Sequence, residues 1–155
     1  MTDRTVQMDA NDSVPRVVVG VDDSPASHAA LRWATRHAQL IGGVVEAVGA
    51  WEPPSHFGWS APVVDHTFDR ELAERRFADG LRAALDGEQP VEVRQAMVMG
   101  DPSDVLLDAA RGAEVLVVGS DGRGGFTRAL LGSVSTRCAQ HAGCPVVIVR
   151  AKRQD

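Results

Sequence analysis

The sequence contains very little lysine. Lys152, close to the carboxyl terminus, is the one lysine among 155 residues. In P-loop proteins a lysine contacts the nucleotide phosphates, and other enzymes use a lysine to form a Schiff base or to act as a general base. A single lysine at this position argues against all three kinds of site. A phosphate-binding site in this chain would therefore have to use other groups.

Cysteine is also scarce, and long apolar runs are missing. Cys138 and Cys144 are too few for the disulfide framework of a small secreted domain, and their spacing matches no zinc-binding pattern. We therefore expect either two buried structural thiols or two cysteines without a particular role. No apolar run approaches the roughly 18 residues of a membrane-spanning helix, and residues 1–15 lack the hydrophobic core of a signal peptide. The sequence thus predicts a cytoplasmic protein that does not enter a membrane.

Positive charge is in deficit. Sixteen Lys and Arg residues stand against 21 Asp and Glu residues, which gives a formal net charge of −5. Proteins that bind nucleic acid or anionic membranes usually present clustered positive charge, so the composition argues against both kinds of partner. The five histidines show no metal-ligand spacing on one face with a carboxylate, and the sequence therefore predicts no zinc site.

Apolar runs alternate with helical patterns from residue 16 onward. The length suits one domain, which we place at residues 16–151, after a polar segment at 1–15 that we expect to be a flexible arm. Strands are expected at 16–22, 44–50, 91–99, 114–120 and 145–150. Helices are expected from Pro25 to the pair Gly42 and Gly43, after a Thr67 cap, after an Asp101-Pro102 start, and at 133–141. Residues 51–66 are expected to form a loop, whose role the sequence does not assign.

This order of elements predicts an α/β fold with a doubly wound parallel sheet. In such sheets ligands bind beyond the carboxyl ends of the strands, where the strand order reverses. The first and fourth strands are the most apolar, so we expect both to be central. Residues suited to binding follow each of them, namely Gly20, Val21, Asp22 and Ser24 after the first and the segment 119–135 after the fourth. The sequence therefore predicts a binding crevice between these two segments.

The segment 119–135, with the sequence GSDGRGGFTRALLGSVS, has features of an anion site. Gly119 and Gly122 permit positive φ and close approach of the backbone to a ligand. Backbone N–H groups at the start of a helix attract anions, and a helix is expected after Gly132. The side chains that would add to the site are those of Ser133, Ser135, Arg123 and Arg128. The alternative is that these glycines only mark tight turns.

The spacing G-x2-G-x9-G-S, which begins at Gly119, resembles the ATP-binding signature of the universal stress protein (UspA-like) family. The segments VVVGVDDSPAS, AVGAW, VLVVGS and CPVVIVR are also similar to that family, so the resemblance extends over residues 17–150. It implies a Rossmann-like, adenine nucleotide alpha hydrolase-like sheet of five parallel strands in the order 3-2-1-4-5. It also implies a homodimer paired through the last strand, residues 145–150, which would otherwise be an exposed apolar edge.

The resemblance further implies an adenine nucleotide site, with ATP and Mg²⁺ as expected ligands. Residues implied to lie against the adenosine are Gly20, Val21, Asp22, Ala50, Val118 and Gly119. Residues implied to surround the phosphates are Gly122, Arg123, Gly132, Ser133, Val134 and Ser135. Asp22 is alternatively a residue near Mg²⁺ or merely a polar group at a strand end. Gly49 and Asp121 depart from the residues common in the family, and a carboxylate beside a triphosphate is unfavourable unless it points outward or meets Mg²⁺.

The implied function is that of an ATP-binding regulatory or stress-response module. The segment has no evident general base, arginine finger or Walker-type aspartate, so we predict no catalytic residue. One alternative is a slow ATPase, or a protein that phosphorylates itself on Ser133, Ser135 or Thr127. Two further alternatives are a cyclic AMP-binding protein and a dimeric scaffold that binds no nucleotide.

Overall fold

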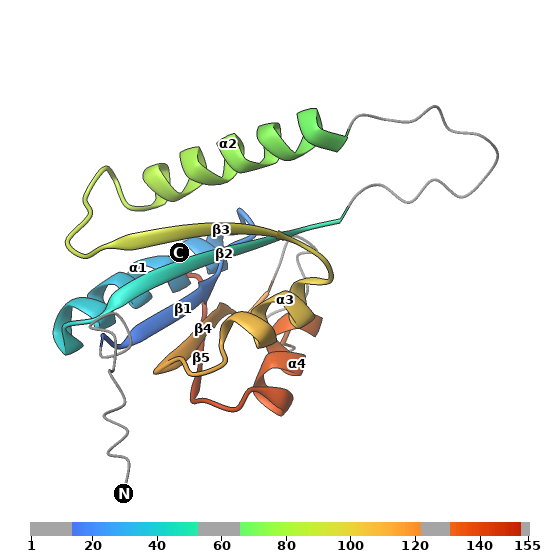
Figure 1. Ribbon diagram of the computed structural model, residues 1–155. Helices are drawn as coiled ribbons and strands as arrows, with labels where there is room; N and C mark the ends of the chain where they lie inside the picture. The colour runs from blue at the N-terminus through green and yellow to red at the C-terminus, as the bar shows by residue number, and fades with distance from the viewer. Residues whose placement is uncertain (1–13, 53–65, 122–130, 153–155) are drawn as a thin grey trace, which may run out of the picture.

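A parallel sheet with helices on both faces organises the chain (Figure 1). The computed structural model describes residues 14–52, 66–121 and 131–152. The strands in these ranges are β1 (Arg16–Gly20), β2 (Val44–Trp51), β3 (Val93–Met99), β4 (Val115–Gly119) and β5 (Val146–Val149). The helices are α1 (Pro25–Ile41), α2 (His66–Ala84), α3 (Pro102–Ala109) and α4 (Ser133–His141). The strand order is β3-β2-β1-β4-β5 and every neighbouring pair is parallel, which confirms the predicted fold class and strand order.

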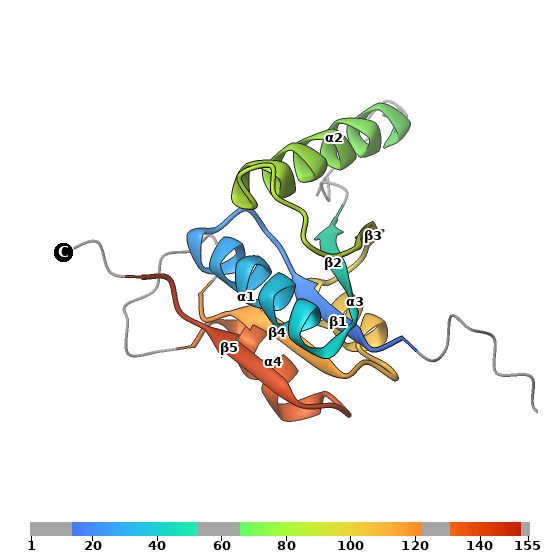
Figure 2. The ribbon, with the colours of Figure 1, turned by 90° about the vertical axis from the view of Figure 1, so that its left-hand side faces the viewer.

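β1 occupies the centre of the sheet, and the helices form one layer on each face. Val19 of β1 is paired with Ala47 of β2 on one side and with Val117 of β4 on the other. α1 packs against β1 and β4, and α2 packs against α1 and β3. α3 packs against β1, β2 and α4 on the opposite face, so that α1 lies in front of the sheet and α3 and α4 behind it in Figure 2. Strand order reverses at β1, as the predicted crevice requires.

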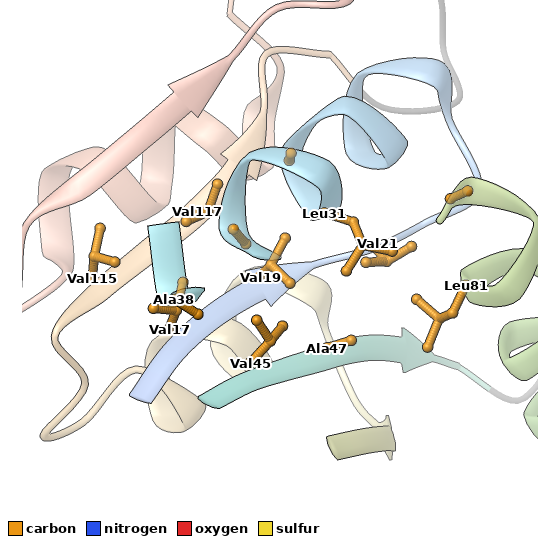
Figure 3. Packing of buried hydrophobic residues seen from close by; sticks show 13 residues of the cluster. Val17, Val19, Val21, Leu31, Ala38, Val45, Ala47, Leu81, Val115 and Val117 are labelled. Carbon is orange, nitrogen blue, oxygen red and sulfur yellow. The ribbon is translucent and has the colours of Figure 1, made fainter. Parts of the chain in front are cut away.

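The apolar strands supply two separate cores because successive side chains point to opposite faces of a sheet. Val17 and Val19 point to the α1 face and belong to one buried cluster, in which Val17 lies near Ala38 and Val19 near Leu31 (Figure 3). Val18, between them in the sequence, belongs to the other cluster, which contains Leu106 of α3. All three valines are fully buried. Because helices cover both faces of the sheet, the side chains at the centre of this strand are all buried, and the strand is apolar throughout its centre instead of alternating between apolar and polar residues.

Helix starts follow the capping residues that the sequence provides. Ser24 is the N-cap of α1, and its side chain accepts a hydrogen bond from the Ser27 N–H. Asp101 caps α3 in the same way through the N–H groups of Ser103 and Asp104. The predicted Thr67 cap is wrong, because α2 already begins at His66 and Thr67 lies inside it. A residue inside a helix has lost the extended backbone that an N-cap requires.

The strands are one or two residues shorter than predicted at several ends. β1, for example, ends at Gly20 rather than at residue 22, although the N–H of Val21 still donates to the Val48 carbonyl at 3.0 Å. Most of the predicted arm at 1–15 and of the predicted loop at 51–66 lies outside the described residues. None of the helices in the described ranges is both long and apolar enough to cross a membrane.

Candidate functional site

A cleft of about 280 Å³ opens at the carboxyl ends of β1, β2 and β4, between the start of α1 and the starts of α3 and α4. The predicted site residues that line it are Gly20, Val21, Asp22, Ala50, Val118, Gly119, Gly132, Ser133, Val134 and Ser135. Gly122 and Arg123, the two remaining members of the predicted set, lie outside the described residues. The structure thus brings together every predicted site residue that it describes.

The cleft is also lined by residues that sequence reasoning missed. Val48 of β2, Leu106 of α3 and Pro102 at the α3 start line it, as does Ser27 of α1. Val48 and Leu106 belong to the core cluster on the α3 face, so they carry no signal beyond an apolar pattern. In the sequence, the proline that starts α3 indicates only the start of a helix. The buried side chains of Val48 and Leu106 give the cleft an apolar floor.

The start of α4 presents free backbone donors to the cleft. Its N-cap, Gly132, provides no side-chain cap, and its own N–H donates to the Ser120 carbonyl at 2.7 Å. The N–H groups of the next three residues, Ser133, Val134 and Ser135, have no acceptor within the helix because of helix geometry. These donors lie at the positive end of the helix dipole. This arrangement suits an anion, as the sequence predicted for this segment.

The two serines of this turn differ in what their hydroxyls do. Ser135 is buried, and its hydroxyl lies 3.0 Å from the Gly132 carbonyl oxygen and 3.3 Å from that of Ser120, to either of which it can donate. That hydroxyl therefore joins α4 to the end of β4, in place of the ligand-facing donor expected from the sequence. Ser133 is exposed, and its hydroxyl remains a candidate donor at the rim.

A hydrogen-bond network fixes the turn after β1. Asp22 accepts at Oδ1 from the backbone N–H of Ser24 at 3.1 Å and from its hydroxyl at 2.6 Å. The backbone N–H of Asp22 donates to Ser27 Oγ at 3.3 Å. Asp23 within this turn has a φ of 70°, which is rare for a residue with a side chain. Asp22 is thereby held at the cleft, a placement compatible with each of its three predicted roles.

Two glycines of the site lie in close contact with other parts of the protein. A Cβ at Gly119 would lie 2.8 Å from both the Ala26 carbonyl carbon and the Ser27 nitrogen, so β4 and the start of α1 are in backbone contact there. Gly119 is not among the described residues with positive φ, and the helix, not a ligand, explains the missing side chain. A Cβ at Gly20 would lie 2.7 Å from Leu106 Cδ1. The positive φ that the sequence permits is therefore not used at Gly119, whereas the close approach of its backbone to a ligand stays a prediction, because Gly119 lines the cleft.

The charged side chains of the cleft are acidic. Asp22 and Asp121 line it, whereas the lining residues that the structure describes include no Lys or Arg. Asp121 is half-buried and accepts from Ser120 Oγ at 3.1 Å. No group of three or more His, Cys, Asp or Glu side chains in the described ranges could hold a metal ion. Attraction for an anion within these ranges therefore comes from the backbone of α4.

Comparison with known sequences identifies relatives of this chain. A universal stress protein of Mycolicibacterium smegmatis is 36% identical over 145 residues, which cover 92% of this chain and 48% of the relative. A universal stress protein of Mycobacterium tuberculosis is 35% identical over 153 residues, which cover 92% of this chain and 50% of the relative. The chain therefore spans about half the length of these curated relatives.

Solved structures share the fold. The universal stress protein UspA from Lactobacillus plantarum superposes with a TM-score of 0.71 at 23% identity, covering 88% of this chain and 97% of that one. A universal stress protein solved in complex with cAMP gives a TM-score of 0.62 at 27% identity, and the match covers 90% of this chain and 98% of that one. An Arabidopsis thaliana universal stress protein family member with AMP bound gives a TM-score of 0.60 at 20% identity, and the match covers 89% of this chain and 92% of that one.

The match to a known family extends over the whole fold. The sequence model described as the universal stress protein family matches residues 14–150, which include all five strands and all four helices described above. The curated relatives agree with that match. This chain belongs to the universal stress protein family.

Proposed function

We propose that this chain binds an adenine nucleotide in the cleft, with ATP and Mg²⁺ as its ligands, and acts as a nucleotide-binding regulatory module. The observation that carries the proposal is the meeting of the uncapped start of α4 with the ends of β1 and β2 around one cleft. An uncapped helix start offers three backbone donors to phosphate oxygens. The apolar floor offers a surface to a planar base.

The sheet order favours one orientation of the nucleotide. α4 begins beside β4, on one side of β1, whereas Ala50 lies near the end of β2 on the other side. A phosphate chain at Ser133 would leave the ribose near Gly119 and Asp22, and the base toward Ala50. The relatives of known structure with AMP and cAMP support an adenine nucleotide as the class of ligand. They make AMP and cAMP necessary competitors in any test of the preference for ATP.

Magnesium fits this site only as a companion of the phosphates. The described protein groups do not form a metal site of their own, but Asp22 and Asp121 place carboxylate oxygens along the cleft. Mg²⁺ in nucleotide sites is typically held by one or two carboxylates together with phosphates and water. Bound Mg²⁺ would also reduce the repulsion between Asp121 and a triphosphate.

The direct experiment has two parts. Purified protein is denatured and any released nucleotide is identified by chromatography, and the nucleotide-free protein is then titrated with ATP, AMP and cAMP by calorimetry, with and without Mg²⁺. We expect binding of ATP that is tightened by Mg²⁺. If none of the three binds more tightly than about 1 mM, which corresponds to about −4 kcal/mol, the proposal is refuted.

A matched pair of variants at Ser133 tests the phosphate position. Ser133→Asp adds a negative charge at the first turn of α4, which the helix dipole tolerates well but which would repel a phosphate. Like charges about 4 Å apart at a protein surface repel by about 1–4 kcal/mol, so ATP affinity should fall about fivefold or more. Ser133→Asn is the uncharged control of similar shape and should change affinity little. Equal affinities of the two variants would place the phosphates elsewhere.

A catalytic function is the second candidate, and the exposure of Ser133 at the rim favours testing it. Protein incubated with γ-labelled ATP would release labelled phosphate if it were a slow ATPase, or retain label if it phosphorylated itself. Loss of either signal on replacement of Gly132 would assign the activity to the cleft. A stable ATP complex without turnover would support the regulatory module.

The proposed assembly is a homodimer through β5. Within the described residues β5 pairs with β4 alone, and its four residues Val146–Val149 are all apolar and half-buried. An unpaired apolar edge strand is a surface that proteins usually cover. Sedimentation of the wild type against Ile148→Lys tests this directly. A monomeric wild type would refute the dimer without affecting the nucleotide proposal.

A further inference from the structure

A second chamber of about 580 Å³, roughly twice the volume of the cleft, lies beneath α2. Residues of α2, of the ends of β2 and β3, and of the β1–α1 turn line it, and they include Trp51, Phe77, Met97, Ala73 and Arg76. The chamber shares four lining residues with the cleft, namely Val21, Asp22, Ala50 and Pro102. The two spaces are therefore neighbours across the ends of β1 and β2.

Two apolar lining residues of the chamber, Phe77 and Met97, lie against Gly49 of β2. A Cβ at Gly49 would lie 2.9 Å from Met97 Sδ and 2.9 Å from Phe77 Cε2. The absence of a side chain on β2 thus lets the ring of Phe77 and the thioether of Met97 lie directly against the strand. Aromatic rings and thioethers are favourable partners for a planar ring. The chamber consequently offers a ring-binding surface that any larger residue at position 49 would disturb.

The charges around the chamber decide which part of a ligand fits there. Its lining includes the carboxylates of Asp22, Asp23 and Glu52 against one cation, Arg76. An excess of negative charge disfavours phosphate groups. The free backbone donors that suit phosphate belong to α4, which lines only the cleft. The chamber therefore suits an uncharged apolar ring and not a second phosphate.

We propose that this chamber is a second compartment of the nucleotide site, which takes an uncharged aromatic ring attached to the base of an adenine nucleotide. The inference rests on the proposed function, because it needs the phosphates at α4. With that orientation the base points toward Ala50, and Ala50 lines both spaces. A substituent on the base then extends from the cleft into the chamber. The chamber would make the site selective for base-modified adenine nucleotides over the unmodified ones.

The experiment compares AMP with three analogues that carry a benzyl group on the base, linked at N6, at C2 or at C8. Three attachment points are used because a single linkage can point the ring away from the chamber. We expect at least one analogue to bind about tenfold more tightly than AMP, since burial of most of a phenyl ring gives a gain of that size. Affinities are measured by calorimetry on the same nucleotide-free protein.

Variants of α2 show whether the gain comes from the chamber. Ala73→Phe fills the chamber, and Ala73→Leu fills it with a smaller side chain if the first variant is poorly folded. Ala83→Phe is the matched control, because Ala83 is exposed on the same helix and lines neither space. We expect the Ala73 variants to abolish the tenfold gain while AMP affinity changes little, and Ala83→Phe to preserve both.

The outcomes separate the two proposals. AMP binding without a gain for any analogue, or a gain that survives in the Ala73 variants, overturns the second compartment and leaves the nucleotide site intact. Absence of binding by AMP, ATP and all three analogues overturns the nucleotide site and the compartment together. A gain that is lost only in the Ala73 variants supports both.

Discussion

Replacement of Gly119 by alanine tests whether packing or ligand binding determines this glycine. The structure places an added Cβ 2.8 Å from two backbone atoms, the Ala26 carbonyl carbon and the Ser27 nitrogen. Backbone atoms at a helix start cannot rotate away as a side-chain tip can. The variant therefore has to move the start of α1 away from β4. Because Ser27 lines the cleft, the same movement would widen it.

The expected cost follows from overpacking of a close-packed interior. Inserting one methyl group where nothing can yield costs about 1–3 kcal/mol of unfolding free energy. For a chain of this length each kcal/mol lowers the Tm by about 2–4 °C, so we expect Gly119→Ala to lower it by about 2–12 °C. Gly20→Ala should cost less, because its added Cβ meets the tip of Leu106, which can change rotamer. Gly143→Ala meets nothing within 4 Å and should be neutral or slightly stabilising.

Urea denaturation followed by circular dichroism measures the three variants, with calorimetric titration of ATP on each. The predicted order of destabilisation is Gly119→Ala, then Gly20→Ala, then Gly143→Ala. A Gly119→Ala protein that unfolds at the wild-type urea concentration but binds ATP weakly would refute the packing argument. It would restore the view that this glycine serves the ligand. A change in m-value would show that the denatured state had changed instead.

Three further predictions concern stability and its dependence on pH. Ser24→Ala removes the N-cap of α1 and should lower the unfolding free energy by about 1 kcal/mol in urea denaturation, whereas an unchanged value would contradict the capping role. Leu31→Ala, at a side chain with no exposed surface, should cost about 2–5 kcal/mol in the same assay, and a cost near that of an exposed residue would contradict the core assignment. Burial raises the pKa of the Cys138 thiol, so the unfolding free energy should be unaffected below the ordinary thiol pKa and should fall as pH rises above it. The loss of stability at alkaline pH that is due to this thiol should disappear in Cys138→Ala. If the unfolding free energies of the two proteins depend on pH in the same way, the raised pKa of Cys138 is contradicted.

The element order was predictable because each local signal acts over a few residues. Ser24 followed by Pro25, and Asp101 followed by Pro102, start helices where the pattern indicated. The alternation of strands and helices implies a parallel sheet for a steric reason, since the crossover helices must cover both faces. The order of the strands came from the family resemblance, because pairing partners lie far apart in the chain. The Thr67 cap was wrong, since α2 starts at His66, two residues before the start that this cap implies.

The candidate site was predictable to the extent that it consists of chain segments following strand ends. Segments such as 20–22 and 132–135 are brought together by the parallel topology alone. Its floor was not predictable, because Val48 and Leu106 are apolar residues whose neighbours depend on which face each helix covers. The hydroxyl of Ser135 likewise looked like a ligand group until packing joined it to backbone carbonyls.

The sequence by itself determined how phosphate can be bound in a chain with one lysine. It places a glycine and two serines at a helix start, whose backbone N–H groups are the proposed substitute for a lysine, and the position of these donors depends only on local helix geometry. Tertiary structure decided what surrounds that helix start. Contacts between residues distant in the chain made Gly119 a packing residue and set Phe77 and Met97 against Gly49. Such contacts depend on the mutual packing of whole elements, which no local pattern encodes.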